Sequence, residues 1–282
     1  MKVFVTGATG QLGFDVMREL EKRQIACCGV GSQQLNITDQ RAVKAGLQEY
    51  RPDVLIHCAA YNWVDLAQTE TEQCFKLNVS ATQYLAQTCR EIGTYMISIS
   101  SDYVFDGCKN GFYEVDDQKH PLSVYGQSKS LGEEAVLLNA PGSAVVRTSW
   151  LFGSNSRNHG NFVESILKAS VNREVLSVVS DQVGSPTFTE DLALLLCQML
   201  RERPSGVYHA TNEGICSRAD FARGILKIGN TLCRVEDVSS AAYPSAAERP
   251  KNSRLSKRCL DSVGLSHLPD WQEALVRYFK NR

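Results

Sequence analysis

Short apolar runs alternate with segments of helical periodicity along the first 150 residues. After the first run, Leu12, Val16 and Leu20 recur every four residues, which places them on one face of a helix. A longer helix is expected over 70–92. This alternation predicts an α/β fold, a doubly wound parallel sheet with helices on both faces. The expected strands are Val3–Val5, Ile25–Val30, Val54–Ala60, Tyr95–Ser100 and Val145–Thr148.

The pattern loosens after Trp150, where the stretch 154–161 is polar and contains glycine. Apolar runs and helical periodicity resume further along the chain. We therefore expect a dinucleotide-binding domain over 1–150, completed by parts of 175–212. A smaller, interleaved C-terminal substrate domain is expected over 151–282. The later elements that the pattern predicts are helices at 162–170, 189–201, 217–228 and 270–280, and strands at 175–179 and 207–210.

The composition is that of an ordinary globular protein, with 43% hydrophobic and 22% charged residues. The formal net charge is -1, so no overall basic field indicates a nucleic-acid partner. No run approaches the roughly 18 apolar residues of a membrane-spanning helix, and we expect no signal peptide, because Met1–Thr6 leads directly into a strand. The cysteines and histidines lack metal-ligand spacing, so we expect a cytoplasmic protein with reduced thiols.

Three glycines follow the first expected strand, Gly7, Gly10 and Gly13, in the spacing G-x-x-G-x-x-G. Strand, glycine loop and helix are the context in which a dinucleotide diphosphate binds. Glycine allows the backbone to approach the diphosphate closely, and the helix N-terminus favours its negative charge. The spacing differs from the usual G-x-G-x-x-G, and a tight strand-to-helix turn is the simpler alternative.

The end of the second expected strand gives no sign of cofactor preference. In NAD enzymes an acidic residue there binds the adenine ribose, and an arginine accommodates the additional phosphate of NADP. The sequence at 31–34 is GSQQ, with neither residue type. Asp39 follows and is placed to cap the helix expected over 41–49.

Small and polar side chains lie at the ends of the next two expected strands. Ala59 and Ala60 would let a cofactor lie against the strand end, although alanine also suits ordinary packing. Ser100, Ser101 and Asp102 bring polar groups to the carboxyl edge of the sheet, where open α/β sheets bind ligands. We therefore expect the functional site at this edge.

Tyr125 and Lys129 lie one helical turn apart and are the candidate acid–base pair. A free phenol has a pKa of about 10 and exchanges protons poorly at neutral pH. An ammonium group one turn away favours the phenolate, so we expect Lys129 to lower the pKa of Tyr125. Such a pair can handle the proton of a carbonyl or alcohol oxygen, although the same spacing also occurs on many surface helices.

Seven motifs together resemble the extended short-chain dehydrogenase/reductases, and more narrowly the dTDP-4-dehydrorhamnose reductase family. The resemblance covers nearly the whole chain. YGQSK is common to the wider superfamily, whereas SSDYVFDG, RTSWLFG and DQVGSPT in this order are more specific to the sugar reductases. The motifs are GATGQLG at 7–13, AAYNWVDLAQTE at 59–70, SSDYVFDG at 100–107, YGQSK at 125–129, RTSWLFG at 147–153, DQVGSPT at 181–187 and ERPKNSRL at 248–255.

The resemblance implies a Rossmann-like fold and a role for each matching residue. Tyr125 would be the proton donor, with Lys129 as its partner and as a ligand of the nicotinamide ribose. Ser101 would contact the substrate oxygen where relatives have threonine or serine, and either hydroxyl can donate. Asn36 falls where relatives often have aspartate. The implied substrate contacts are Ser101, Asp102, Trp150, Asn62 and Val64. The implied cofactor contacts are Gly7, Gly10, Gln11, Leu12, Gly13, Asn36, Ile37, Ala59, Ala60, Tyr61, Ile99, Tyr125 and Lys129.

The implied reaction is reduction of dTDP-4-dehydro-L-rhamnose, a dTDP-4-keto-6-deoxyhexose, to dTDP-L-rhamnose for surface polysaccharide biosynthesis. NADPH, or NADH, would deliver hydride to C4 while Tyr125 protonates the oxygen. We expect a monomer or homodimer with no nucleic-acid or membrane partner. Some family members hold Mg²⁺ between subunits through carboxylates, which raises the question for Asp15, Glu190 and Asp191. Acids in a first helical turn are also expected from the helix dipole, and we assign no metal ligand.

Other functions on the same fold remain alternatives. A non-catalytic NADP-binding subunit, like the regulatory subunit of methionine adenosyltransferase, would not need the intact Ser101, Tyr125 and Lys129. An epimerase or another 4-keto nucleotide-sugar reductase would keep these residues. A 4,6-dehydratase places an Asp-Glu pair after the serine or threonine, whereas this chain has Asp102-Tyr103.

Several candidate residues also have structural interpretations. Trp150 is as readily a core aromatic as a substrate contact. Arg147 lies next to a strand and suits a structural role. Arg249 and Arg254 lie in a proline-containing segment, where they would either meet a diphosphate or sit in an exposed loop.

Overall fold

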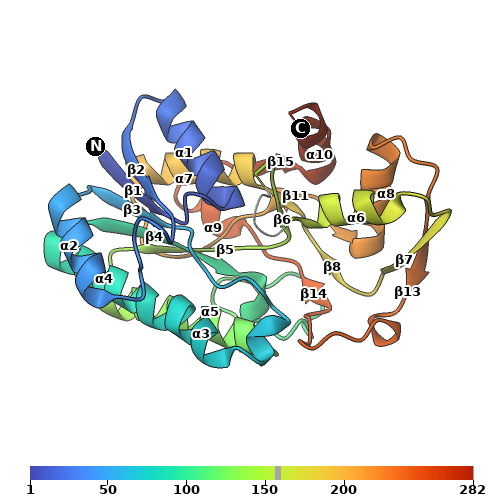
Figure 1. Ribbon diagram of the computed structural model, residues 1–282, viewed down its shortest axis with the longest axis horizontal. Helices are drawn as coiled ribbons and strands as arrows, with labels where there is room; N and C mark the ends of the chain where they lie inside the picture. Colours follow the sequence, from blue (N-terminus) through green and yellow to red (C-terminus); the bar gives the residue numbers. More distant parts are fainter. Residues whose placement is uncertain (156–159, 282) are drawn as a thin grey trace.

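The computed structural model describes residues 1–155 and 160–281. A six-stranded sheet in the order β10-β5-β4-β3-β1-β2 runs through the larger part of the molecule, and every neighbouring pair is parallel (Figure 1). The sheet grows in opposite directions from β1 and β3, and open α/β sheets bind ligands at such a reversal. The expected doubly wound parallel sheet is therefore confirmed. Its strands are β1 (Lys2–Thr6), β2 (Ala26–Val30), β3 (Val54–His57), β4 (Tyr95–Ser101), β5 (Ala144–Thr148) and β10 (Gly206–His209).

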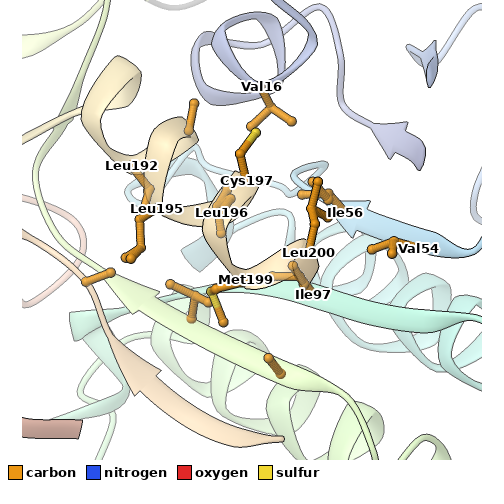
Figure 2. Close-up of a cluster of buried hydrophobic side chains, with 14 of the residues drawn as sticks. Val16, Val54, Ile56, Ile97, Leu192, Leu195, Leu196, Cys197, Met199 and Leu200 are labelled. Atoms are coloured by element: carbon orange, nitrogen blue, oxygen red, sulfur yellow. The ribbon is translucent and has the colours of Figure 1, made fainter. Parts of the chain in front are cut away.

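Helices cover both faces of this sheet (Figure 1). On one face, α1 (Gln11–Lys22) and α7 (Thr189–Glu202) pack against each other and against the strands. On the other face, α2 (Gln40–Tyr50), α4 (Ala81–Ile92) and α5 (Val124–Asn139) form a second apolar layer. Figure 2 shows the first layer, where α7 is apolar along its buried side because it lies between α1 and the sheet. The labelled α7 side chains are Leu192, Leu195, Leu196, Cys197, Met199 and Leu200, and their labelled neighbours are Val16, Val54, Ile56 and Ile97.

The long helix expected over 70–92 is interrupted. It consists of α3 (Thr71–Phe75), a π-helical turn at Lys76–Ser80, and α4. The Asn78 side chain accepts from the backbone N–H of Tyr61 at 2.8 Å and donates to the Tyr61 carbonyl oxygen at 3.2 Å. These two bonds link the helix to the chain after β3. Such π-helical turns recur near functional sites.

A second apolar core lies beside the sheet, among the elements that follow β5. It is built by α6 (Phe162–Ser170), α8 (Arg218–Ile228) and α10 (Trp271–Lys280), with β7 (Val175–Val179) paired in parallel with β13 (Arg234–Val238). Strand β13 was not predicted, because three of its five residues are charged and it is largely exposed. The remaining short strands are β6 (Leu151–Phe152), β8 (Val183–Gly184), β9 (Thr187–Phe188), β11 (Asn212–Glu213), β12 (Cys216–Ser217), β14 (Asn252–Ser253) and β15 (Leu268–Asp270).

Two elements that follow residue 150 belong to the sheet domain. Helix α7 packs on α1, and β10 extends the sheet beside β5. The domain boundary near residue 150 itself stays a prediction, and part of the polar stretch 154–161 lies outside the described residues. Within the described ranges, no helix is both long and apolar enough to cross a membrane.

Candidate active site

A cavity of about 410 Å³ opens at the carboxyl edge of the sheet. It brings together residues that the sequence places more than 140 positions apart. The predicted site residues that line it are Gly7, Gly10, Gln11, Leu12, Gly13, Ala60, Asn62, Val64, Ile99, Ser101, Asp102, Tyr125, Lys129 and Trp150. The cavity therefore contains most of the predicted cofactor contacts and all of the predicted substrate contacts.

The glycine loop between β1 and α1 has the geometry that a diphosphate requires. Gly7 adopts a left-handed φ of +71°, and a Cβ there would lie 2.6 Å from the backbone nitrogen of Ala59. A Cβ on Gly13 would lie 2.2 Å from the carbonyl oxygen of Gly7. Among the side chains of residues 1–155 and 160–281, none caps the N-terminus of α1, and the first turn of this helix carries no acidic residue. The amides of that turn are thus free of side-chain acceptors and can receive an anion.

Helix α5 carries Tyr125 and Lys129 into the cavity. Ser123 caps the helix by accepting from the backbone N–H of Gly126 at 3.1 Å. Inside the fold, Asn78 donates to the Ser128 hydroxyl at 2.9 Å, and Ser128 donates to the Tyr125 carbonyl oxygen at 2.7 Å. This buried network fixes the first turn of α5 against the π-helical turn, and so positions the tyrosine.

Burial controls the protonation of both members of the pair. It raises the pKa of Tyr125, while the Ser101 hydroxyl acts in the opposite direction. Burial also lowers the pKa of Lys129 to about 8. Contrary to the expectation of a lowered value, the pKa of Tyr125 is therefore raised in the protein alone, and loss of solvation is the largest cause. The phenol stays protonated at neutral pH, which suits a proton donor.

His57 lies beneath this pair and is neutral. The Thr6 hydroxyl lies 2.7 Å from Nδ1 and the Thr82 hydroxyl lies 3.1 Å from Nε2. Burial lowers the pKa of His57 to about 3, and the nearby Lys129 acts in the same direction. Both ring nitrogens are occupied by hydroxyl groups, so His57 supports the end of β3 and is not an acid or base of the site.

Asp102 is held in place by two serines. Ser101 donates to one carboxylate oxygen at 3.0 Å, and Ser253 from β14 donates to the other. Burial raises the pKa of Asp102 above its ordinary value, and both serine hydroxyls act against that change. The ERPKNSRL segment therefore reaches the cavity by orienting Asp102.

Trp150 lies on the wall of the cavity with an unusual backbone. Its φ of +51° is rare for a bulky residue and indicates local constraint. The Arg218 guanidinium carbon lies 3.7 Å from the centroid of a Trp150 ring. Gly184 leaves room for the ring, since a Cβ there would come within 3.0 Å of it. Trp150 is partly buried and borders the second core, so its packing and cavity positions coincide.

The sequence matches the family described as RmlD substrate binding domain over residues 1–282. The chain belongs to this family. Spore coat polysaccharide biosynthesis protein SpsK of Bacillus subtilis (strain 168) is 38% identical over 283 residues, covering 100% of this chain and 98% of that protein. The dTDP-4-dehydrorhamnose reductase of Aggregatibacter actinomycetemcomitans is 36% identical over 287 residues, covering 97% of each.

A solved structure of the same family resembles the fold closely. The dTDP-4-dehydrorhamnose reductase of Bacillus anthracis str. Ames, in complex with NADP, is 35% identical with a TM-score of 0.95. The alignment covers 100% of this chain and 99% of that chain. The Rossmann-like architecture is therefore that of this RmlD family.

Four predicted cofactor residues do not line the cavity. Asn36 is exposed and its side chain accepts from Thr38, while Ile37 is buried in the apolar layer with α2. Ala59 packs beside the glycine loop, and the Tyr61 hydroxyl donates to Glu70 at 2.8 Å. Contact between these four residues and a cofactor stays a prediction.

Sequence reasoning missed several residues of the cavity. Trp63 and Ser149 line it between predicted residues of the RmlD-family motifs, and Arg218 enters from α8. Trp63 and Ser149 could have been found from their places inside AAYNWVDLAQTE and RTSWLFG. No motif marks Arg218, because the packing of α8 against Trp150 depends on tertiary structure.

The three carboxylates considered for Mg²⁺ already have cationic partners. Arg18 lies 2.5 Å from Glu190 and 3.3 Å from Asp15, and Arg277 lies 2.8 Å from Asp191. Among the described residues, no group of three or more His, Cys, Asp or Glu side chains is arranged to hold a metal ion. The geometry does not support a metal site here.

Proposed function

We propose that the protein reduces dTDP-4-dehydro-L-rhamnose to dTDP-L-rhamnose with NADPH. The main support for this proposal is that one cavity contains the glycine loop, the candidate catalytic residues Ser101, Tyr125 and Lys129, and the polar residue Asp102. The named relatives of the RmlD family and the NADP complex of one of them support the substrate and the cofactor. The product would feed surface polysaccharide synthesis, in line with the name of the SpsK relative.

Different residues would bind the cofactor, orient the substrate and transfer the proton. The glycine loop and the N-terminus of α1 would bind the cofactor diphosphate. The cofactor supplies hydride to C4 of the sugar. Tyr125, protonated at neutral pH, gives its proton to the C4 oxygen as that oxygen gains negative charge. The Ser101 hydroxyl, which donates to Asp102 in the protein alone, would turn to donate to the same oxygen and so orient it. Lys129 would bind the nicotinamide ribose.

Lys129 also suits the recovery of the proton. Its pKa of about 8 lies close to neutral pH, so the ammonium can exchange protons more readily than an ordinary lysine. The Ile99 carbonyl oxygen, 2.7 Å from Nζ, holds the ammonium against the end of β4. We assign Lys129 the task of restoring the phenol proton after each turnover.

The test is oxidation of NADPH by the purified protein with a panel of nucleotide 4-keto sugars. We expect turnover with dTDP-4-dehydro-L-rhamnose, and the sugar product identified by mass spectrometry and NMR. Tyr125→Phe is the negative control. Failure with every 4-keto sugar, despite NADPH binding, would favour the non-catalytic binding subunit. Tightly bound NAD⁺ after purification with net-neutral turnover would favour an epimerase.

A further inference from the structure

Arg218 stands between the active-site cavity and a second cavity of about 1220 Å³. Among the described residues that line them, it is the one common to both. Arg218 is the first residue of α8 and directly follows the capping residue Ser217. The second cavity runs from this point along α6, β7 and the segment around Tyr243. A ligand that fills both cavities must therefore pass the guanidinium.

Aromatic rings hold the Arg218 side chain. The guanidinium carbon lies 3.7 Å from the Trp150 ring centroid and 5.1 Å from that of Phe162. Stacking of this kind uses the faces of the guanidinium and leaves its N–H groups, which point outward in its plane, available to donate. The residue is thereby pre-oriented without its hydrogen bonds being used.

Within the described part of the chain, the Arg218 guanidinium forms no ion pair and no side-chain hydrogen bond, and the carboxylate that acts on it is Asp102, at longer range. Asp102 is near enough to act on it electrostatically, yet both carboxylate oxygens of Asp102 already accept from serines. Burial lowers the pKa of Arg218 from its ordinary value. A desolvated guanidinium without an anionic partner is unfavourable, so an anionic ligand would be favoured here.

The other basic residues near the second cavity are engaged. Arg249 donates to both carboxylate oxygens of Asp65, and Lys251 lies 3.6 Å from Asp181. The ion pair with Asp65 argues against Arg249 as the diphosphate ligand. Arg254 donates to the Asn252 side chain at 2.7 Å and is not among the residues that line the second cavity.

The second cavity suits the nucleoside end of a nucleotide sugar. Phe162, Ile166, Val178 and Tyr243 give it an apolar lining, and such surfaces bind aromatic bases. With the sugar against Ser101 and Trp150, the diphosphate would fall at the junction. The guanidinium fork matches two phosphate oxygens at once.

We propose that Arg218 recognises the diphosphate of the nucleotide sugar at the junction of the two cavities, with the nucleoside in the second cavity. The inference rests on the proposed function for the identity of the ligand. It assigns Arg218 a binding role that the sequence motifs did not indicate.

The test measures binding of dTDP and of thymidine, which lacks phosphate, to the NADPH-loaded protein. Calorimetry serves for dTDP and ligand-observed NMR for the weaker thymidine. Arg218→Met keeps an apolar stem but removes the charge, and Arg258→Met on the exposed α9 (Arg258–Asp261) is the matched control. We expect Arg218→Met to weaken dTDP about 10- to 100-fold, with thymidine and NADPH affinities unchanged.

Two results would overturn the inference. One is dTDP affinity in Arg218→Met within twofold of wild type; the other is an equal loss of dTDP and thymidine affinity, which indicates that Arg218 only shapes the cavity. If Arg218→Met loses NADPH binding through misfolding, Arg218→Lys decides. That variant keeps the charge without the fork, so dTDP should bind more weakly while NADPH binds normally, and wild-type dTDP affinity would contradict the proposal.

This experiment separates the inference from the proposed function. If the wild-type protein binds dTDP through Arg218 but reduces no 4-keto sugar, the reductase proposal fails and the diphosphate site stands. If the wild-type protein reduces the sugar while Arg218→Met binds dTDP normally, only the inference about Arg218 fails.

Discussion

The ammonium group of Lys129 donates a 2.7 Å hydrogen bond to the carbonyl oxygen of Ile99. This bond connects α5 to the end of β4, so the lysine is fixed by the sheet and not only by its own helix. The pKa of Tyr125 is raised chiefly by burial of the phenol.

Removing the phenol proton should abolish most of the turnover. Tyr125→Phe keeps the ring, and proton transfer typically contributes 10²- to 10⁴-fold, so we expect kcat to fall by about that factor. NADPH affinity should change little. Steady-state kinetics and NADPH titration provide the measurement, with Tyr50→Phe, a tyrosine on the far layer, as control. Near wild-type kcat in Tyr125→Phe would refute the assigned acid.

Trp150→Ala should act on substrate binding more than on folding. We expect kcat/KM to fall by a factor equivalent to about 1–3 kcal/mol, because the ring that borders the cavity and holds Arg218 is removed. Trp271→Ala is the contrast, because Trp271 is buried in the second core and its loss should cost about 3–5 kcal/mol of stability. Kinetics and thermal unfolding of both variants measure the difference. Equal loss of melting temperature in the two would place Trp150 in the core instead.

Arg147 and Glu133 form a buried bidentate pair, with two N–O distances of 2.8 Å. Arg147→Met should therefore destabilise the protein by about 3–5 kcal/mol, because it leaves a carboxylate buried beside Ser100 without its main partner. Denaturant unfolding measures the change. The double variant Arg147→Met, Glu133→Leu should recover part of the loss. A single-variant cost under about 0.5 kcal/mol, the size expected for Arg258→Met on the surface, would contradict this account.

Discrimination between NADH and NADPH should be weak. The end of β2 carries neither an acid nor an arginine, and the Gln34 side chain there accepts from the backbone N–H of Gly31 at 2.9 Å. We expect kcat/KM to favour NADPH, but by less than about 1000-fold, some 4 kcal/mol. Kinetics with both cofactors at saturating sugar test this. A larger ratio of kcat/KM between NADPH and NADH would show that residues outside the end of β2 distinguish the adenosine parts of the two cofactors.

Asp15 should make stability fall between about pH 4 and pH 6. Burial between α1 and α7 raises the pKa of Asp15 from 3.8 to about 6. The native state therefore holds this proton at pH values where the unfolded chain releases it, and stability from the group is lost as pH rises through the folded pKa. Asp15→Asn should flatten that part of the profile. Thermal unfolding across the range measures it, and an unchanged slope in the variant would exclude the group.

The sequence predicted the sheet and its helices because those elements depend on local periodicity. Asp39, predicted to cap α2, does accept from the backbone N–H groups of Arg41 and Ala42. The interruption at Lys76–Ser80 was missed, since it depends on bonds between Asn78 and the distant Tyr61. Arg218 was missed for the same reason, and β13 was missed because it is charged and exposed and is defined by its pairing with β7. Their positions come from tertiary contacts that neither propensity nor spacing records.

The late position of α7 and β10 in the sequence has a consequence for synthesis on the ribosome. A nascent chain that ends near residue 150 would have five of the six sheet strands but would lack the helix that covers Val54, Ile56 and Ile97 (Figure 2). Its apolar face and the open edge of β5 would be exposed until about 60 further residues emerge, which at 5–20 residues per second takes several seconds. During that interval the chain would depend on chaperones that shield apolar surfaces. Gene truncations or pauses in this segment should therefore yield aggregates and not a folded half-protein.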